Sequence, residues 1–161
     1  MAINCVGIFC EDVREEMGGT HTIIGVMPDN INLQGQEGLK LPDGDRGKLL
    51  LPKMGFYVRT NLDASAPAPK QITAAISFPG HGIIPLGTLG TEAIEKAFAD
   101  SRSNKTPFVG VVFKAVVSPL TITESGIASL HVNVDGQEQM CGALNIQIID
   151  PLDATASPPP A

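Results

Sequence analysis

The chain has 161 residues and a mass of 16.9 kDa, the size of one domain that can bury a hydrophobic core. Apolar residues make up 43% of it, which excludes disorder for most of its length, and a net charge of −6 with scattered Lys and Arg argues against nucleic-acid binding. Only 17% of residues are charged, so the surface is either partly covered by another molecule or made polar by Ser, Thr, Asn and Gln.

The N-terminus does not resemble a signal peptide, because MAINCVGIFCED lacks a basic segment and its apolar run stops at Glu11. No apolar stretch approaches the ~20 residues that a membrane span needs. Three cysteines, Cys5, Cys10 and Cys141, indicate free thiols in a reducing compartment rather than a disulfide framework. We therefore expect a cytoplasmic or virion protein that is not secreted by a signal peptide and does not bind membranes.

Alternation of apolar and polar residues with a period of two predicts most of the strands. In chain order they are expected over 3–10, 20–27 with a short extension at 30–33, 54–60, 72–78, 108–117, 129–134 and 140–149. The strand over 54–60 places Tyr57 and Arg59 on its solvent side. Asp135-Gly136 separates the last two strands and suits the positive φ angles of a type I′ hairpin turn.

One segment, about 91–103, has a helical pattern. Thr91 is its N-cap candidate, and Ile94, Ala97 and Phe98 form an apolar stripe. We expect this helix to cover an open end or edge of the strands.

The predicted fold is all-β: an antiparallel two-sheet sandwich, Ig/C2-like or jelly-roll-like, of about seven to nine strands. Residues 1–149 form this single domain, with the helix and an Ala/Pro connector at 61–70. Residues 150–161 form a Pro/Ala-rich, extended tail.

The sequence shows no pattern that predicts a catalytic, metal or cofactor site. The acids around Glu11 and Asp12 lack the spacing of a calcium loop, and the histidines and cysteines lack zinc spacing. Nucleophile elbows and phosphate-binding loops are also missing. We therefore expect a protein that is not an enzyme and carries no cofactor.

The segments Phe9-Cys10-Glu11-Asp12-Val13-Arg14, Gly18-Gly19 and Ile23-Ile24-Gly25-Val26 resemble the opening of an uncharacterised bacterial domain family of unknown function. Its members begin with a short strand, an E/D-D-V-R-like turn and a G-G…I-G-V hairpin, and often close on a Val-Asp-Gly turn such as 134–136 here. The resemblance covers only those two regions. It implies a β-sandwich and brings no catalytic residues.

Two functions are compatible with these features. The first is a non-catalytic interaction or assembly protein, most concretely a phage or phage-like capsid decoration or tail accessory protein that binds itself or other particle proteins. The second is a stand-alone ligand- or protein-binding module whose loops 35–47 and 79–90 form the binding end.

Two segments are candidates for contact with a protein partner. An acidic connector between the first two strands, closed by Gly18-Gly19, is either a contact patch or a structural pin in which a buried pair of Asp12 and Arg14 holds the hairpin to the sheet. The patch consists of Glu11, Asp12, Arg14, Glu15 and Glu16. The candidate assembly arm is the tail, with Pro151, Pro158, Pro159 and Pro160.

Overall fold

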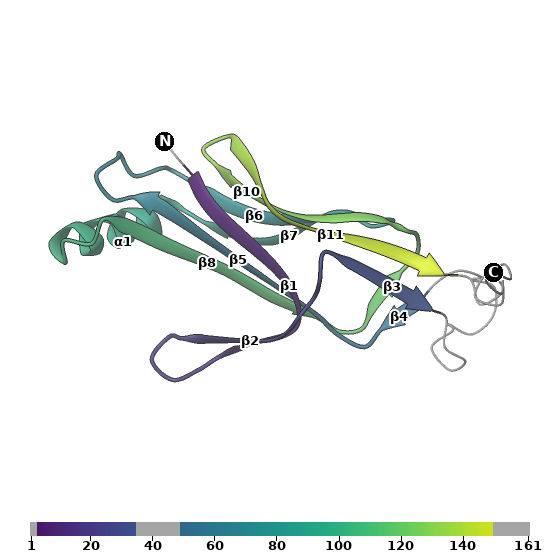
Figure 1. Ribbon diagram of the computed structural model, residues 1–161. Helices are drawn as coiled ribbons and strands as arrows, with labels where there is room; N and C mark the ends of the chain where they lie inside the picture. The colour runs from purple at the N-terminus through teal and green to yellow at the C-terminus, as the bar shows by residue number, and fades with distance from the viewer. Residues whose placement is uncertain (1–2, 35–48, 150–161) are drawn as a thin grey trace, which may run out of the picture.

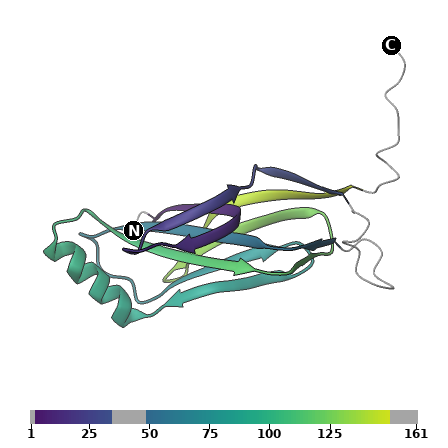
Figure 2. The same cartoon turned by 90° about the horizontal axis from the view of Figure 1, so that it is seen from below.

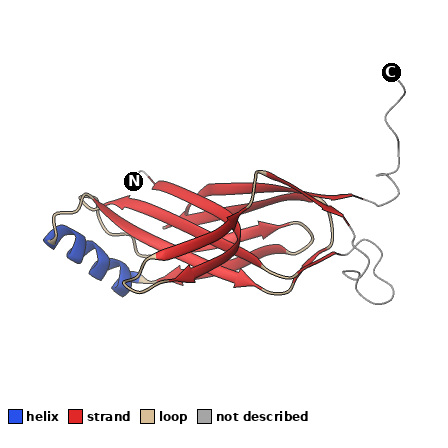
Figure 3. Cartoon of the chain, turned by 60° about the horizontal axis from the view of Figure 1, so that its bottom comes forward, coloured by secondary structure: helices blue, strands red, loops and turns tan. Residues whose placement is uncertain are grey.

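A computed structural model gives the structure of the chain and describes residues 3–34 and 49–149 (Figure 1). Strands make up most of this part of the chain, and one helix follows the seventh strand (Figure 3). In chain order the elements are β1 (Ile3–Glu15), β2 (His21–Val26), β3 (Asn30–Gln34), β4 (Leu49–Leu51), β5 (Met54–Asp63), β6 (Ile72–Phe78), β7 (Gly82–Leu89), α1 (Thr91–Ser103), β8 (Phe108–Val117), β9 (Leu120–Ile122), β10 (Gly126–Val134) and β11 (Gln137–Ile149).

The strands form two large sheets, so the expected all-β class is confirmed. One sheet has the order β2-β1-β5-β8 and the other β3-β11-β10-β6-β7, while β4 and β9 form a separate pair. Several details differ from the expectation. The described residues form eleven strands rather than the expected seven to nine. Strand β3 is no extension of β2 but joins the other sheet, where it runs parallel to β11, and the supposed loop at 79–90 contains the whole of β7.

A single hydrophobic core fills the space between the two large sheets. On β6, alternate residues from Ile72 to Phe78 are buried, and on β5 the buried set includes Phe56 and Val58. Each of the large side chains among them, such as Ile72, Phe78 and Phe56, contributes about 1.5–3 kcal/mol on burial. The period-two pattern therefore fixes which face of each strand points inward, and hence which face is left outside.

A disulfide between Cys5 on β1 and Cys141 on β11 joins the two sheets along one side of the body. Beside it the two backbones nearly touch, because a Cβ added to Gly142 would lie 2.4 Å from the carbonyl oxygen of Gly7. The expectation of three free thiols was therefore wrong, and the cysteines no longer support a reducing compartment. Only Cys10 is free, and burial raises the pKa of its thiol.

The hairpin of β10 and β11 is formed as its sequence predicts. Asp135 and Gly136 both have positive φ, at 48° and 88°. The Asp135 carboxylate also accepts hydrogen bonds from the backbone N–H groups of Lys70 and Gln71, at 2.9 Å each through Oδ1. The turn residue therefore ties the 61–70 connector to the sheet as well.

Helix α1 occupies the expected residues and lies at one end of the body (Figure 2). Its N-cap is Gly90 rather than Thr91, whose hydroxyl instead donates to the carbonyl of Lys70 at 2.9 Å. Ile94 and Phe98 are buried, and they place the helix against the core.

Among the helices of the described residues, none has the length and apolarity needed to cross a membrane.

Candidate protein-interaction site

The second half of β1 and all of β2 form a hairpin, residues 11–26, which we call the arm. Gly18 and Gly19 make its turn with φ angles of 84° and 76°, a conformation that glycine adopts without strain. The backbone N–H of Glu16 closes the turn with a 2.8 Å hydrogen bond to the carbonyl of Thr20. This is the strand connection that the Gly-Gly pair predicts.

The arm folds back over the outer face of the four-stranded sheet. Figure 1 shows it turned back below β5 and β8. Cys10 is the last residue of β1 paired with β5, opposite Gly55, and a Cβ added to Gly55 would lie 3.4 Å from the backbone of Asp12, so β1 turns over β5 there. Further along, the His21 ring packs edge-on against Tyr57, with 5.8 Å between ring centroids. Tyr57 is therefore buried, whereas its position on the strand predicted a solvent-facing side chain.

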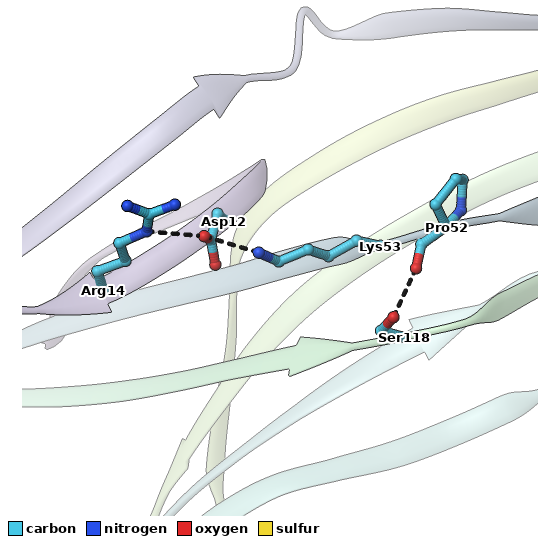
Figure 4. A network of polar contacts seen from close by, with 5 residues as sticks. All are labelled: Asp12, Arg14, Pro52, Lys53 and Ser118. Carbon is cyan, nitrogen blue, oxygen red and sulfur yellow. Dashed lines mark hydrogen bonds and ion pairs between the residues drawn. The ribbon is translucent and has the colours of Figure 1, made fainter.

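Ion pairs fasten the arm to the sheet. The Asp12 carboxylate lies 2.7 Å from Lys53 Nζ, next to the start of β5, and 3.0 Å from Arg14 Nε within the arm (Figure 4). The Lys53 segment is held by a hydrogen bond of 2.6 Å from the Ser118 hydroxyl to the carbonyl of Pro52. Asp12 and Arg14 pair as the sequence suggested, but the pair is not buried, because Arg14 is 63% exposed, and Lys53 rather than Arg14 makes the link to the sheet.

Nearer the tip of the arm, Glu15 pairs with Lys114 of β8. Hydrogen bonds from Lys53 and then Arg14 lower the pKa of Asp12, and a hydrogen bond from Lys114 lowers the pKa of Glu15. Both carboxylates are thus ionised partners within the chain at neutral pH.

The structure divides the predicted contact patch. Asp12 and Glu15 have cationic partners in their own chain, and the Glu11 side chain lies against Gly25. Arg14 and Glu16 are exposed. Contact between the patch and another protein stays a prediction. The candidate assembly tail, residues 150–161 with its four prolines, lies outside the described residues.

The outer face of the five-stranded sheet is different in kind, and we call it the uncharged face. Strand pairing and alternation place on it side chains from all five strands. They are Asn30, Asn32, Thr73, Ala75, Ser77, Ile83, Pro85, Thr88, Ile127, Ser129, His131, Asn133, Glu138, Met140, Ala143, Asn145 and Gln147. Among these residues there is no Lys, Arg or Asp, and Glu138 is the single carboxylate.

Three large apolar side chains stand out from this face. Ile83, Ile127 and Met140 are 77%, 65% and 60% exposed. Small residues lie between them. Some of the polar groups pair with one another: His131 Nε2 shares a hydrogen bond of 2.7 Å with the Ser129 hydroxyl, and its Nδ1 lies 3.4 Å from Glu138. Depletion of charge around exposed apolar side chains is typical of the centre of a protein–protein interface.

One end of the uncharged face borders a shallow hollow of about 520 Å³. Its lining comes from the ends of β6 and β10 and from the turn between β6 and β7, with Phe78, Pro79, Glu124 and Ile127 among the residues. Within residues 3–34 and 49–149, no three His, Cys, Asp or Glu side chains are grouped as a metal site would need.

A scan against protein-family models and a search of curated proteins both found no match to this sequence.

Sequence reasoning missed the uncharged face, although a signal for it exists. The solvent-facing residues of 72–78 and 129–134 are Thr, Ala, Ser, His and Asn, so two strands without Lys, Arg, Asp or Glu could be recognised in advance. That these strands are neighbours, and that β7 adds Ile83 and Pro85 to the same face, depended on the tertiary structure.

Proposed function

We propose that this chain is a non-catalytic interaction or assembly protein that binds a protein partner with its uncharged face. The observation that carries the proposal is the absence of Lys, Arg and Asp from the described residues of that face, together with the exposure of Ile83, Ile127 and Met140. An antiparallel strand with one solvated side normally alternates buried apolar residues with polar ones, and on this face hardly any of the polar residues carry a charge. A wide face with many polar and almost no charged side chains can stand in water. Covering it with a partner costs little free energy, because few charges must be removed from solvent.

In its most concrete form, the protein is a structural component of a phage or phage-like particle, such as a capsid decoration or tail accessory protein. A sandwich of Ig/C2-like or jelly-roll-like type offers such a particle a rigid, flat contact surface. The Pro-rich residues 150–161 would act as a second contact, since a tethered segment raises the overall affinity without changing the first interface.

The test is whether the protein co-purifies with particles through this face. Ile127→Lys and Met140→Lys each place a charge among apolar neighbours, and Val6→Lys is a matched control on the opposite outer face, where Val6 is 48% exposed. In particles purified from producing cells, we expect the two face variants to lose at least about tenfold in bound copies, roughly 1.4 kcal/mol, and Val6→Lys to bind like the wild type.

The assembly proposal is wrong if wild-type protein is absent from every particle or complex fraction of its producing cells. Equal binding of wild type and both face variants would instead reject the uncharged face as the contact. Deleting residues 150–161 tests the tail separately, because unchanged particle binding of the truncated chain would remove the tail from the proposal.

The hollow beside Phe78 and Glu124 favours a second candidate, a stand-alone ligand-binding module. A ligand present at 100 times its dissociation constant would stabilise the chain by about 2.7 kcal/mol. A thermal-shift screen of small molecules and metal ions measures this, and a screen without a shift would exclude a tight small-molecule site.

A further inference from the structure

The margins of the two sheets differ in how they are protected against pairing with another strand. Strand β7 contains Pro85, which cannot donate a backbone hydrogen bond, and its pairing with β6 shifts register there. Strand β3 has 5 residues, and β2 has 6 and includes Gly25 at a positive φ of 63°. Short strands, bulges and prolines are the usual protections of a sheet edge.

Strand β8 is neither short nor interrupted by a bulge or proline, and of the other usual protections of an edge it carries a single charge, Lys114. It has 10 residues, contains no proline and pairs with β5 in unbroken register from Phe108 to Val117. Within the described part of the chain, no strand pairs with its other edge. All of its residues are apolar except Lys114, whose charge is paired with Glu15 of the arm. Figure 2 shows β8 along the margin of its sheet.

From this edge we infer that two copies of the chain associate by antiparallel pairing of β8 with β8, which joins their four-stranded sheets into one. The occupant is a second copy because the strand is complementary to itself. With Val112 opposite Val112 on the two-fold axis, Phe108 faces Val116 of the other copy and Lys114 faces Gly110. Apolar side chains then meet apolar ones, and the two lysines are kept apart.

Gly110 supports this register. Its φ is not in the left-handed region, and a Cβ added there would meet nothing closer than 3.6 Å, an ordinary contact with Asn61. The fold of one chain therefore does not require glycine at this position. Opposite a second copy, the missing side chain leaves room for Lys114. If the two-fold axis instead passed through residue 111 or residue 113, Lys114 would lie opposite Phe108 or Val112 of the other copy.

The chain offers a matched pair of variants for the test. Val112 and Val6 flank Arg59 on its two sides in the same sheet, so Val112→Lys and Val6→Lys create the same local repulsion within one chain. Val112 lies on the free edge of β8, whereas Val6 lies on β1 between Cys5 and Gly7, both of which are held against β11. By light scattering with size-exclusion chromatography, we expect wild type and Val6→Lys at twice 16.9 kDa and Val112→Lys at 16.9 kDa, with at least a tenfold weaker dimer.

Gly110→Lys covers the case in which Val112→Lys does not fold. A Cβ at this position meets only ordinary contacts in its own chain, whereas the new lysine would face Lys114 of the second copy and the two charges would repel. Circular dichroism checks the fold of each variant. Val112→Cys should form a cross-linked dimer on oxidation. A monomeric wild type at 100 µM, or a Val112→Lys dimer as tight as that of the wild type, would overturn the inference.

The inference does not depend on what the uncharged face binds. A dimer lost in Ile127→Lys but kept in Val112→Lys would assign self-association to the uncharged face and so reject pairing through β8. Conversely, a β8 dimer that binds no particle would leave this inference standing and reject the proposed function.

Discussion

The two outer faces of this molecule are built from strands of similar length but differ in how they meet water. On the four-stranded sheet, the arm covers Tyr57, and charged side chains such as Lys53 and Lys114 bind it in place. On the five-stranded sheet, Ile83, Ile127 and Met140 are left open with hardly a charge around them. On the first face the arm covers the middle strand, and apolar exposure is limited to residues of the outer strands such as Val6, Phe108 and Val116. The second face has no such cover and leaves apolar surface for another molecule.

Both faces belong to one domain, and the largest expected effect is on the stability of that domain. Replacing Cys5 and Cys141 with serine removes the link between the sheets, and we expect a loss of about 2–5 kcal/mol in the free energy of unfolding. Urea unfolding with and without a reductant measures it. Thiol titration of the unfolded protein should find one thiol before reduction and three after it. Three thiols before reduction would contradict the bridge.

The next effect separates the faces directly. Tyr57→Ala opens a cavity beneath the arm and should cost about 2–4 kcal/mol, because the ring is buried between β5 and His21. Ile127→Ala on the uncharged face should change stability by no more than about 0.5 kcal/mol. Urea unfolding of both variants gives the comparison. If both variants lost the same unfolding free energy, Ile127 would be packed against its own chain and would not be free for a partner.

A smaller effect follows from pH. In the folded chain, the pKa values of Asp12 and Glu15 lie below their ordinary values, so the ion pairs stabilise the fold above about pH 4 and this contribution is lost as pH falls through the lowered pKa values. Asp12→Asn with Glu15→Gln should therefore lose less stability than the wild type between pH 7 and pH 3. Parallel pH profiles would show that these pairs do not hold the arm.

Within the arm, the smallest effect concerns Arg14, which is 63% exposed. Arg14→Ala should change stability less than Lys53→Ala, because Lys53 joins the arm to the sheet while Arg14 bonds only within the arm. Thermal unfolding of the two variants decides the order. A larger loss of stability with Arg14→Ala than with Lys53→Ala would show that the Asp12–Arg14 pair within the arm matters more than the link from Asp12 to Lys53.

Local signals in the sequence predicted the elements whose structure is decided locally. The Asp135-Gly136 turn and the 91–103 helix depend on backbone preferences and short-range periodicity. Strand β7 was missed because Gly82, Pro85 and Gly87 are typical of loops, and only pairing with β6 makes them a strand. The Cys5–Cys141 bridge and the burial of Tyr57 required knowing which distant strands meet.

The most direct test of the central claim compares two methionines. Met140 lies on the uncharged face and Met17 at the tip of the arm, with side chains 60% and 97% exposed. Peroxide oxidation followed by peptide mass spectrometry reports the accessibility of each, in the free protein and in native assemblies purified from producing cells. The account predicts that assembly protects Met140 and leaves Met17 reactive. Protection of Met17 with Met140 unchanged would contradict it and make the arm the contact surface.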